Sequence, residues 1–300
     1  MGRAFETILP WGKNGARDTG APAEAFVERI LWLSAAVSVL SIVLIIGFVC
    51  FKGLPLIGKV GLADFLFSTK WDPTHGQFGI GAMIVGSVAV TAGALLWGVP
   101  LGLALSIFLA EIAPRRIAGF MGEVVNLLAG IPSVVYGFIG LVVLVPFIRE
   151  HLGGWGFSIL AGALVLGIMI LPTIVGIARD AILAVPREYK ESSLALGATH
   201  WQTITRIILP AARSGIVAAI VLGMGRAVGE TMAVVMVTGN VTRVPGSILD
   251  PVRTMTSNVV LEMGYAHGDH QLALFATAAV LFVFILALNL IMTLNMKAGK

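Results

Sequence analysis

Apolar residues fill six long stretches of this 300-residue chain, and polar residues separate them. Roughly 20 mostly apolar residues in a helix are enough to cross the hydrocarbon layer of a bilayer. The pattern therefore predicts an all-α, polytopic membrane fold with six transmembrane helices and no soluble domain. The six predicted spans are 30–51, 80–110, 117–147, 159–177, 214–238 and 272–296.

The spans 80–110 and 117–147 are longer than a crossing requires, which predicts tilt or a kink. Proline is the usual cause of a sharp kink, so Pro100 and Pro132 are the expected positions. Gly98 and Gly102 form a GxxxG pattern that favours close helix packing, as in a dimer of two subunits.

Composition agrees with a membrane protein. Hydrophobic residues make up 57% of the chain and charged residues only 12%. In soluble domains about a quarter of the residues are charged. A single cysteine, Cys50, excludes a disulfide framework, and no basic block suggests nucleic acid. The polar segment 1–29 is too long for the start of a signal peptide, so the first span is expected to be retained.

Lys and Arg residues predict the orientation, because they gather in cytoplasmic loops. With the N-terminus inside, thirteen of them are cytoplasmic and six are outside. Both termini are therefore expected in the cytoplasm. The predicted organisation is a cytoplasmic segment 1–29, a six-helix domain 30–296 and a cytoplasmic end 297–300.

The cytoplasmic segment 186–210, between the fourth and fifth spans, reads as two short helices. Gly197 is a natural helix stop, and Thr199 followed by Gln202 fits a capping box. Trp201, Ile204 and Ile208 are expected on one face, with Pro210 ending the second helix. On these residues alone, an amphipathic connector on the membrane surface remains as good an interpretation as a docking element.

The same segment resembles a family motif. Its spacing matches E-A-A-x3-G-x9-I-x-L-P of the permease subunits of binding-protein-dependent ABC importers, with serine replacing both alanines. The resemblance implies a coupling helix that docks on a separate cytoplasmic ATPase. The matching residues are Glu191, Ser192, Ser193, Gly197, Ile207, Leu209 and Pro210.

By this resemblance the chain is a transport subunit and not an enzyme, with ATP and Mg bound by the partner ATPase and no cofactor of its own. The stretch "GLPLIGKV" fails as a phosphate-binding P-loop at Val60. The five histidines show no metal-ligand spacing, so no metal site is expected.

Four further stretches resemble the permease of phosphate-specific ABC importers, of the PstC type more than the PstA type. This implies an inner-membrane location, inorganic phosphate as substrate, a sister permease, two copies of the ATPase and an extracytoplasmic phosphate-binding protein. The stretches are "WDPTHGQFGIGAMIVGS" (71–87), "LAEIAP" (109–114), "LLAGIPSVVYGFIGL" (127–141) and "GRAVGETMAV" (225–234).

Arg226 and Glu230 lie in the apolar run of the fifth span, where charge is expensive and usually marks function. Four residues apart on one helix, they are expected to share a face and pair. One interpretation is a polar lock between helices. In the other, Arg226 binds an anion in transit, Glu230 accepts a hydrogen bond from hydrogen phosphate, and Gly223, Gly225 and Gly229 keep the face open.

Tyr136 and Ser133 follow Pro132 and are expected either to line the path or to pack around the kink. Three alternatives stay open: a permease for another oxyanion such as sulfate or molybdate, the PstA-like sister subunit, and a stand-alone channel or ion-coupled carrier. A stand-alone protein has no need of the loop 186–210, which separates the last alternative from the others.

Overall fold

The computed structural model describes the backbone of residues 21–298 and the side chains of residues 26–290. Contacts divide the chain into two units, Met1–Phe48 and Val49–Lys300. Helix α1 (Ala21–Val60) begins in the first unit and ends in the second. The predicted terminal segments 1–29 and 297–300 lie mostly outside the described residues.

Four predicted spans are long helices. The first lies in α1, the second in α3 (Gly81–Ile107) with the π-helical turn η2 (Phe108–Ile112), the fourth in α7 (Ile159–Leu183) and the sixth in α14 (Asp269–Ala298). Helix α3 continues through Pro100, so the proline does not break it. All four contain a stretch long and apolar enough to cross a membrane.

The predicted third span is wrong as a single helix. Ile131 and Pro132 are extended, with ψ of 126° and 141°, and they separate two helical segments. A residue before proline avoids the helical region, and proline has no N–H to continue the ladder. Only the second segment, Ser133–His151, is both long and apolar enough to cross a membrane. The pieces are α4 (Arg115–Gly130), α5 (Ser133–Ile139), the π-helical turn η3 (Gly140–Leu144) and α6 (Val145–His151).

The predicted fifth span is also broken. Helix α11 (Arg213–Gly229) stops at Glu230, whose ψ is 135°, and α12 (Met232–Val237) begins two residues later. At its other end α11 meets the preceding helical segment His200–Ala211 at 70°. The described residues thus contain five helices able to cross a membrane, and the predicted six is reached only if this bent pair counts as one span.

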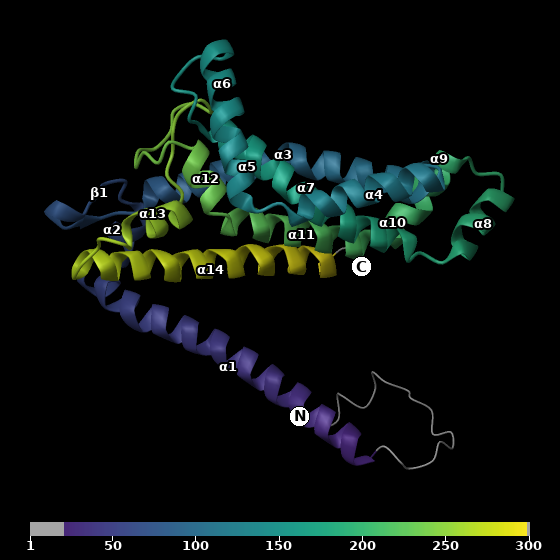
Figure 1. The fold of residues 1–300 in the computed structure, drawn as a ribbon, viewed down its shortest axis with the longest axis horizontal. Coiled ribbons are helices and arrows are strands. Elements are labelled where there is room, and N and C mark those ends of the chain that lie inside the picture. The colour runs from purple at the N-terminus through teal and green to yellow at the C-terminus, as the bar shows by residue number, and fades with distance from the viewer. Residues whose placement is uncertain (1–20, 299–300) are drawn as a thin grey trace. The chain divides into compact units, whose positions relative to one another are not determined.

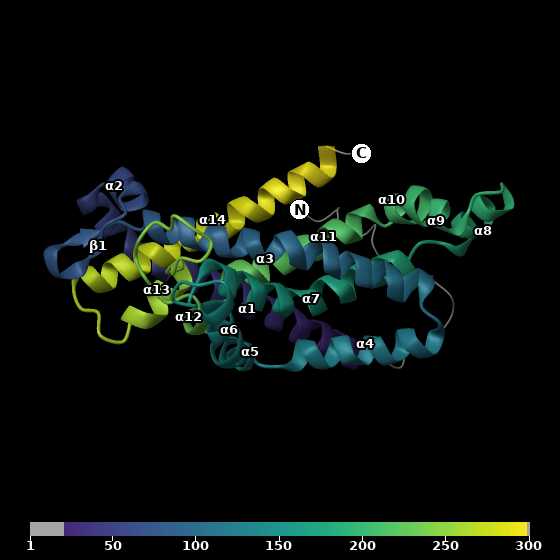
Figure 2. The ribbon, with the colours of Figure 1, turned by 90° about the horizontal axis from the view of Figure 1, so that it is seen from above.

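Helices α3, α7 and α11 lie side by side and form the centre of the second unit (Figure 1, Figure 2). A Cβ on Gly98 of α3 would lie 3.0 Å from Cδ1 of Ile170, and one on Gly102 would lie 2.8 Å from Cγ2 of Ile174. The GxxxG pattern therefore lets α3 approach α7 of the same chain. Its predicted role in a contact between subunits is not needed to explain it.

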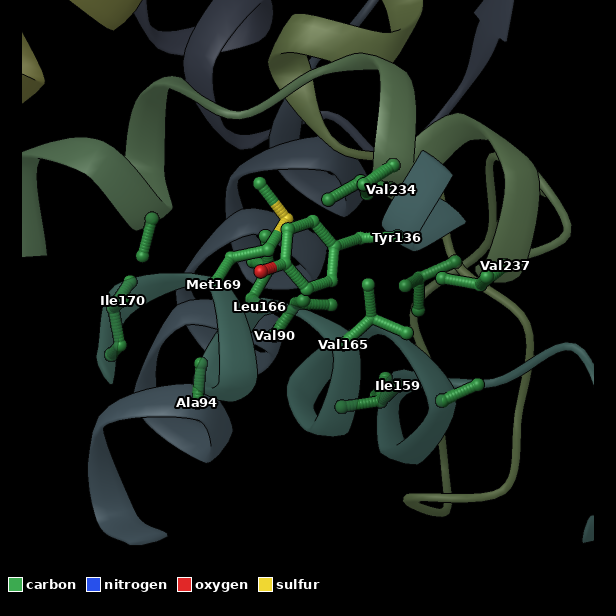
Figure 3. Packing of buried hydrophobic residues seen from close by; sticks show 14 of the residues in the cluster. Val90, Ala94, Tyr136, Ile159, Val165, Leu166, Met169, Ile170, Val234 and Val237 are labelled. Atoms are coloured by element: carbon green, nitrogen blue, oxygen red, sulfur yellow. The ribbon is translucent and has the colours of Figure 1, made fainter. Parts of the chain in front are cut away.

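Buried apolar side chains from α3, α5, α7 and α12 meet in one core (Figure 3). Val90, Leu166 and Met169 pack there with Val234 of the short helix α12. The helix after the break is thus held by the core, although it has only six residues.

Short elements cover the end of the second unit opposite α8 (Arg187–Ala195) (Figure 2). The predicted outer loops 52–79 and 239–270 are more structured than expected. They contain α2 (Leu62–Phe67), the antiparallel strands β1 (Trp71–Asp72) and β2 (Gln77–Phe78), the 3-10 turn η1 (Pro73–His75) and α13 (Met255–Glu262).

Glu262 joins three of these outer segments. Its buried carboxylate is 2.5 Å from Nη1 of Arg253, accepts a hydrogen bond of 2.9 Å from Nε1 of Trp71, and lies 2.8 Å from Nε2 of His270. A carboxylate removed from water requires such compensation. Strand β1, the segment before α13 and the start of α14 are therefore fixed to one another.

Candidate functional site

Arg226 lies in the last turn of α11, and its side chain is exposed in this single chain. Its Nη1 donates a hydrogen bond of 3.3 Å to the Thr173 hydroxyl on α7. No ion pair involving Arg226 is found among the described residues. The guanidinium therefore keeps most of its donors available for another group.

Glu230 does not pair with Arg226, contrary to the expectation from a continuous helix. The extended backbone at Glu230 takes its side chain off the face that carries Arg226. Its Oε1 instead accepts a hydrogen bond of 3.2 Å from the backbone N–H of Ala233, in the first turn of α12. The carbonyl of Glu230 accepts one of 3.1 Å from the Thr256 hydroxyl on α13. The carboxylate thus caps one helix while α13 holds the break.

The predicted open face is present beside Arg226, but one of its three glycines has another role. Added Cβ atoms on Gly225 and Gly229 would meet no heavy atom within 4 Å. A Cβ on Gly223 would lie 2.8 Å from Ile174, so Gly223 serves the packing of α11 on α7. Gly176 of α7 is open as well, which extends the uncluttered surface on the helix that carries Thr173.

Thr173 was not predicted from the sequence. It follows Pro172 inside α7 and is the polar residue of the run "MILPTIV". A hydroxyl in such a run is the signal that could have indicated it, because polar groups in membrane helices usually find partners. The close approach of α7 and α11, which brings Thr173 to Arg226, is not readable from either helix alone.

Tyr136 is buried among core side chains, between Met169 and Val234 (Figure 3). Its hydroxyl donates a hydrogen bond of 2.8 Å to the carbonyl of Leu128, across the break at Pro132. Tyr136 therefore fastens α5 to the end of α4. Ser133, half-buried at the first position of α5, lies at the same break.

The predicted two-helix loop is confirmed in the structure. Helix α8 ends before Gly197, whose φ is +83°. This left-handed conformation favours glycine. Helix α9 (His200–Thr203) begins with the predicted capping box, in which Thr199 and Gln202 bond each other's backbone N–H groups at 3.3 and 2.9 Å. The π-helical turn η4 (Ile204–Ile208) and α10 (Leu209–Ala211) follow.

Two details of this loop differ from the expectation. Ile204 and Ile208 are both buried, but Trp201, which was expected on the same face, is 62% exposed. A π-helical turn follows α9 and changes the helical spacing, which takes Trp201 off the buried face. The helix also continues past Pro210 to Ala211 and turns only at Ala212, since proline is tolerated in the first turn of α10.

The motif residues divide into buried and exposed sets. Ser193 is buried, and its hydroxyl lies 2.9 Å from the buried hydroxyl of Thr203, which ties α8 to α9. Glu191 and Ser192 are exposed, as is the apolar Leu196. Among the remaining motif positions, Ile207 and Pro210 are exposed and Leu209 is half-buried. An exposed polar and apolar surface on two short helices is suited to protein contact.

Groups of three or more His, Cys, Asp or Glu side chains that could hold a metal ion are absent from the described residues. Cys50 is a free thiol. At the candidate path, the chemical group available to a ligand is the guanidinium of Arg226 beside a helix break.

Comparison with known proteins gives a consistent picture. Residues 102–297 match the model of the family described as "Binding-protein-dependent transport system inner membrane component". The chain is 45% identical, over 79% of both chains, to the probable ABC transporter permease protein YqgH of Bacillus subtilis. It is 34% identical, over 98% of both chains, to the phosphate transport system permease protein PstC of Xylella fastidiosa.

Solved structures agree on the fold. A bacterial ABC transporter involved in the import of the acidic polysaccharide alginate matches with a TM-score of 0.57 at 19% identity, covering 92% of this chain and 99% of that one. The MetNI methionine ABC transporter, in an inward-facing conformation, matches with a TM-score of 0.57 at 21% identity, covering 72% and 93%. Since the family model covers well over half the sequence and the relatives match most of it, the chain belongs to the family of binding-protein-dependent transport system inner membrane components.

Proposed function

We propose that this chain is the PstC-like permease subunit of an ATP-driven phosphate importer and that Arg226 contacts phosphate in transit. The similarity to PstC proteins over nearly the whole chain supports the substrate. The observation that carries the site is the available guanidinium of Arg226 on a face kept open by Gly225 and Gly229. Guanidinium groups bind phosphate through paired, charge-assisted hydrogen bonds.

Thr173 and Glu230 have separate parts in this proposal. Thr173 holds one arm of the guanidinium and leaves the others for the anion. Glu230 uses Oε1 to cap α12, and its Oε2 has no hydrogen-bond partner among the described residues. Oε2 accepts a hydrogen bond from the protonated oxygen of hydrogen phosphate. Sulfate carries no such proton near neutral pH, so this acceptor discriminates between the two anions.

The chain acts with partners. A PstA-like sister permease completes the path, a PstS-like extracytoplasmic protein delivers phosphate, and two copies of a PstB-like ATPase bind ATP and Mg. The permease itself needs no cofactor. In this proposal the exposed surface of α8 and α9 is the coupling element and lies on the cytoplasmic side of the inner membrane, and both termini lie on the same side. The outer segments held by Glu262 then face the binding protein.

Alternating access follows from this geometry. Movement of the ATPases displaces α8 and α9, and the displacement reaches α11 through the 70° bend at Ala212. The helix break at Glu230 lets α12 and α11 change their relative angle without unwinding a continuous helix. Discontinuous helices of this kind are common at transporter binding sites.

The test is uptake by the complete four-component importer in proteoliposomes, with labelled phosphate, sulfate and molybdate compared. ATP-dependent uptake of phosphate, with sulfate and molybdate excluded, is expected. Preferential uptake of sulfate or molybdate would show that one of these anions, and not phosphate, is the substrate. Uptake by the permease without the ATPase would indicate a channel or a carrier.

A second arm uses Glu230→Gln, which keeps the cap on α12 but replaces the carboxylate. Because the amide can donate to an unprotonated oxygen, discrimination against sulfate is expected to fall by about 10-fold or more while phosphate uptake continues. Unchanged discrimination between phosphate and sulfate would show that Glu230 does not recognise the proton of hydrogen phosphate.

A further inference from the structure

The end of α3 carries a carboxylate whose role the pathway does not explain. Glu111 lies in the π-helical turn η2, and only 9% of its side chain is exposed. An ionised group this far removed from water persists when an opposite charge lies against it. The opposite charge comes from the loop 186–210, so the ion pair connects this loop to α3.

One carboxylate oxygen of Glu111 faces both helices of the loop. Oε2 is 2.5 Å from Nζ of Lys190 on α8 and 3.9 Å from Nε2 of His200, the first residue of α9. Since Ser193 and Thr203 already join α8 to α9, the two helices contact Glu111 as a unit. Glu111 is thus the charged connection between the loop and α3.

Packing alone does not fill this junction. A cavity of about 540 Å³ lies beside the ion pair, and Glu111, Lys190, Arg115 and Pro186 are among its lining residues. The apolar contact of the loop is made by residues that follow α8: Ile204 and Ile208 meet Ile182 of α7, and Ile107 of α3 and Ala110 of η2 pack against the same cluster. Among the described residues, α8 contributes none to this cluster, so the connection of α8 itself to the end of α3 is the ion pair rather than close-packed apolar side chains.

We propose that Glu111 is a positioning residue that transmits the displacement of α8 and α9 to α3 through its ion pair with Lys190. Neither residue belongs to the matched motif of the loop. Helix α3 packs closely along α7, whose Thr173 holds Arg226, so the connection reaches the candidate site through these two helices. This inference rests on the proposed function, because it assumes that an ATPase moves the loop.

The test exchanges the two charges in the complete importer. Glu111→Lys and Lys190→Glu are each expected to lower the phosphate taken up per ATP hydrolysed by about 10-fold, with the ATPase still bound. The double variant, which restores an ion pair in the opposite sense, is expected to recover most of the loss. A merely structural role would lower assembly, uptake and hydrolysis together and would leave their ratio unchanged.

Two further variants keep the outcome interpretable. Glu111→Gln preserves the shape of the side chain and covers the case in which a charge reversal prevents assembly; it is expected to lower the same ratio. Glu150→Gln removes an exposed carboxylate at the end of α6 and is expected to leave the ratio unchanged.

The two proposals fail in different ways. If the unaltered complex imports phosphate and both Glu111→Gln and Lys190→Glu keep its uptake-to-hydrolysis ratio, the transmitting role of Glu111 is overturned and the proposed function stands. If the unaltered complex imports no phosphate, the proposed function itself is contradicted.

Discussion

Arg226 is a charged residue in an apolar region, and one hydrogen bond to Thr173 holds its side chain. Nη1 of Arg226 is bound to the Thr173 hydroxyl, so the direction of the guanidinium is fixed while its charge is not neutralised. A charge that is not neutralised inside a membrane needs a water-filled path or a transient partner. In the proposed function, an anion that passes the open face of Gly225 and Gly229 is this partner.

Thr173→Val tests this orientation, because valine has nearly the same shape but no hydroxyl. Loss of one hydrogen bond is expected to raise the KM of phosphate uptake about 2- to 10-fold, with a smaller change in kcat. Thr173→Ser retains the hydroxyl and should behave like the unaltered protein. Equal KM values for the valine and serine variants would show that Thr173 does not orient Arg226.

Asp72 provides a pH-dependent prediction in the outer hairpin. Hydrogen bonds from Thr74 and His75 lower the pKa of Asp72 to about 2, from 3.8. Because the folded pKa is the lower one, Asp72 stabilises the turn fully above pH 3.8, and this stabilisation disappears as the pH falls through about 2. Asp72→Asn is therefore expected to lower Tm in detergent at neutral pH.

The Tm difference between Asp72→Asn and the unaltered protein should shrink as the pH falls from 3.8 to about 2, because the carboxyl of the unfolded chain binds a proton before that of the folded chain. Thermal unfolding of both proteins across this range measures the difference. A Tm difference that stays constant down to the lower end of the range would show that the effect of Asp72 does not come from its ionised form.

At the scale of elements, α13 connects the helix break to the outer segments. Its Thr256, in the first turn, binds the carbonyl of Glu230, and its last residue, Glu262, holds Arg253, Trp71 and His270. A short helix with both ends engaged in this way can hold Glu230 in its extended conformation without a long packed surface.

Glu262→Gln tests this connection. It leaves Arg253, whose side chain is only 17% exposed, without its counter-charge. Breaking a buried pair from one side typically costs about 3–5 kcal/mol. A clear fall in Tm is expected in detergent, whereas Glu150→Gln, at an exposed position, should have no effect. Equal Tm values for the two variants would show that the network around Glu262 contributes little to stability.

The elements also show what the sequence can and cannot predict. The loop 186–210 was predicted almost residue by residue, because Gly197, Thr199 and Gln202 act through local backbone geometry. The spans 117–147 and 214–238 were predicted as continuous helices, because apolar content reports the hydrophobicity of side chains and not the path of the backbone.

The two breaks differ in how visible they are. Pro132 indicated the position of the first break in the sequence. A kink was predicted there, whereas the structure has a complete interruption of the helix. The break at Glu230 depends on Thr256, 26 residues further along the chain, and on the cap that Glu230 gives to α12. The contacts of Arg226 with Thr173 and of Glu111 with Lys190 depend in the same way on residues distant in the sequence.

At the scale of the whole molecule, the second unit has a chemical division along its length. One end carries α8 and α9 with exposed apolar and charged side chains, the other carries the segments held by Glu262, and the break between α11 and α12 lies between them (Figure 1). Arg226 belongs to the last turn of α11, next to this break. This arrangement fits a subunit that receives substrate at one end and is driven from the other. Arg226 is the residue on which the proposed path of phosphate depends most, because the remaining features would serve any member of the family.

ATP-dependent uptake of labelled phosphate by the complete importer, with Arg226→Ala compared with Arg116→Ala, is the most direct measurement. Arg116 is an exposed cation at the start of α4 and serves as the control. Removal of a charge-assisted contact to the anion is expected to lower uptake by Arg226→Ala about 10- to 100-fold, with assembly and ATP hydrolysis retained and Arg116→Ala unaffected. Phosphate uptake by Arg226→Ala equal to that of the control would contradict the assignment of Arg226 to the path of phosphate.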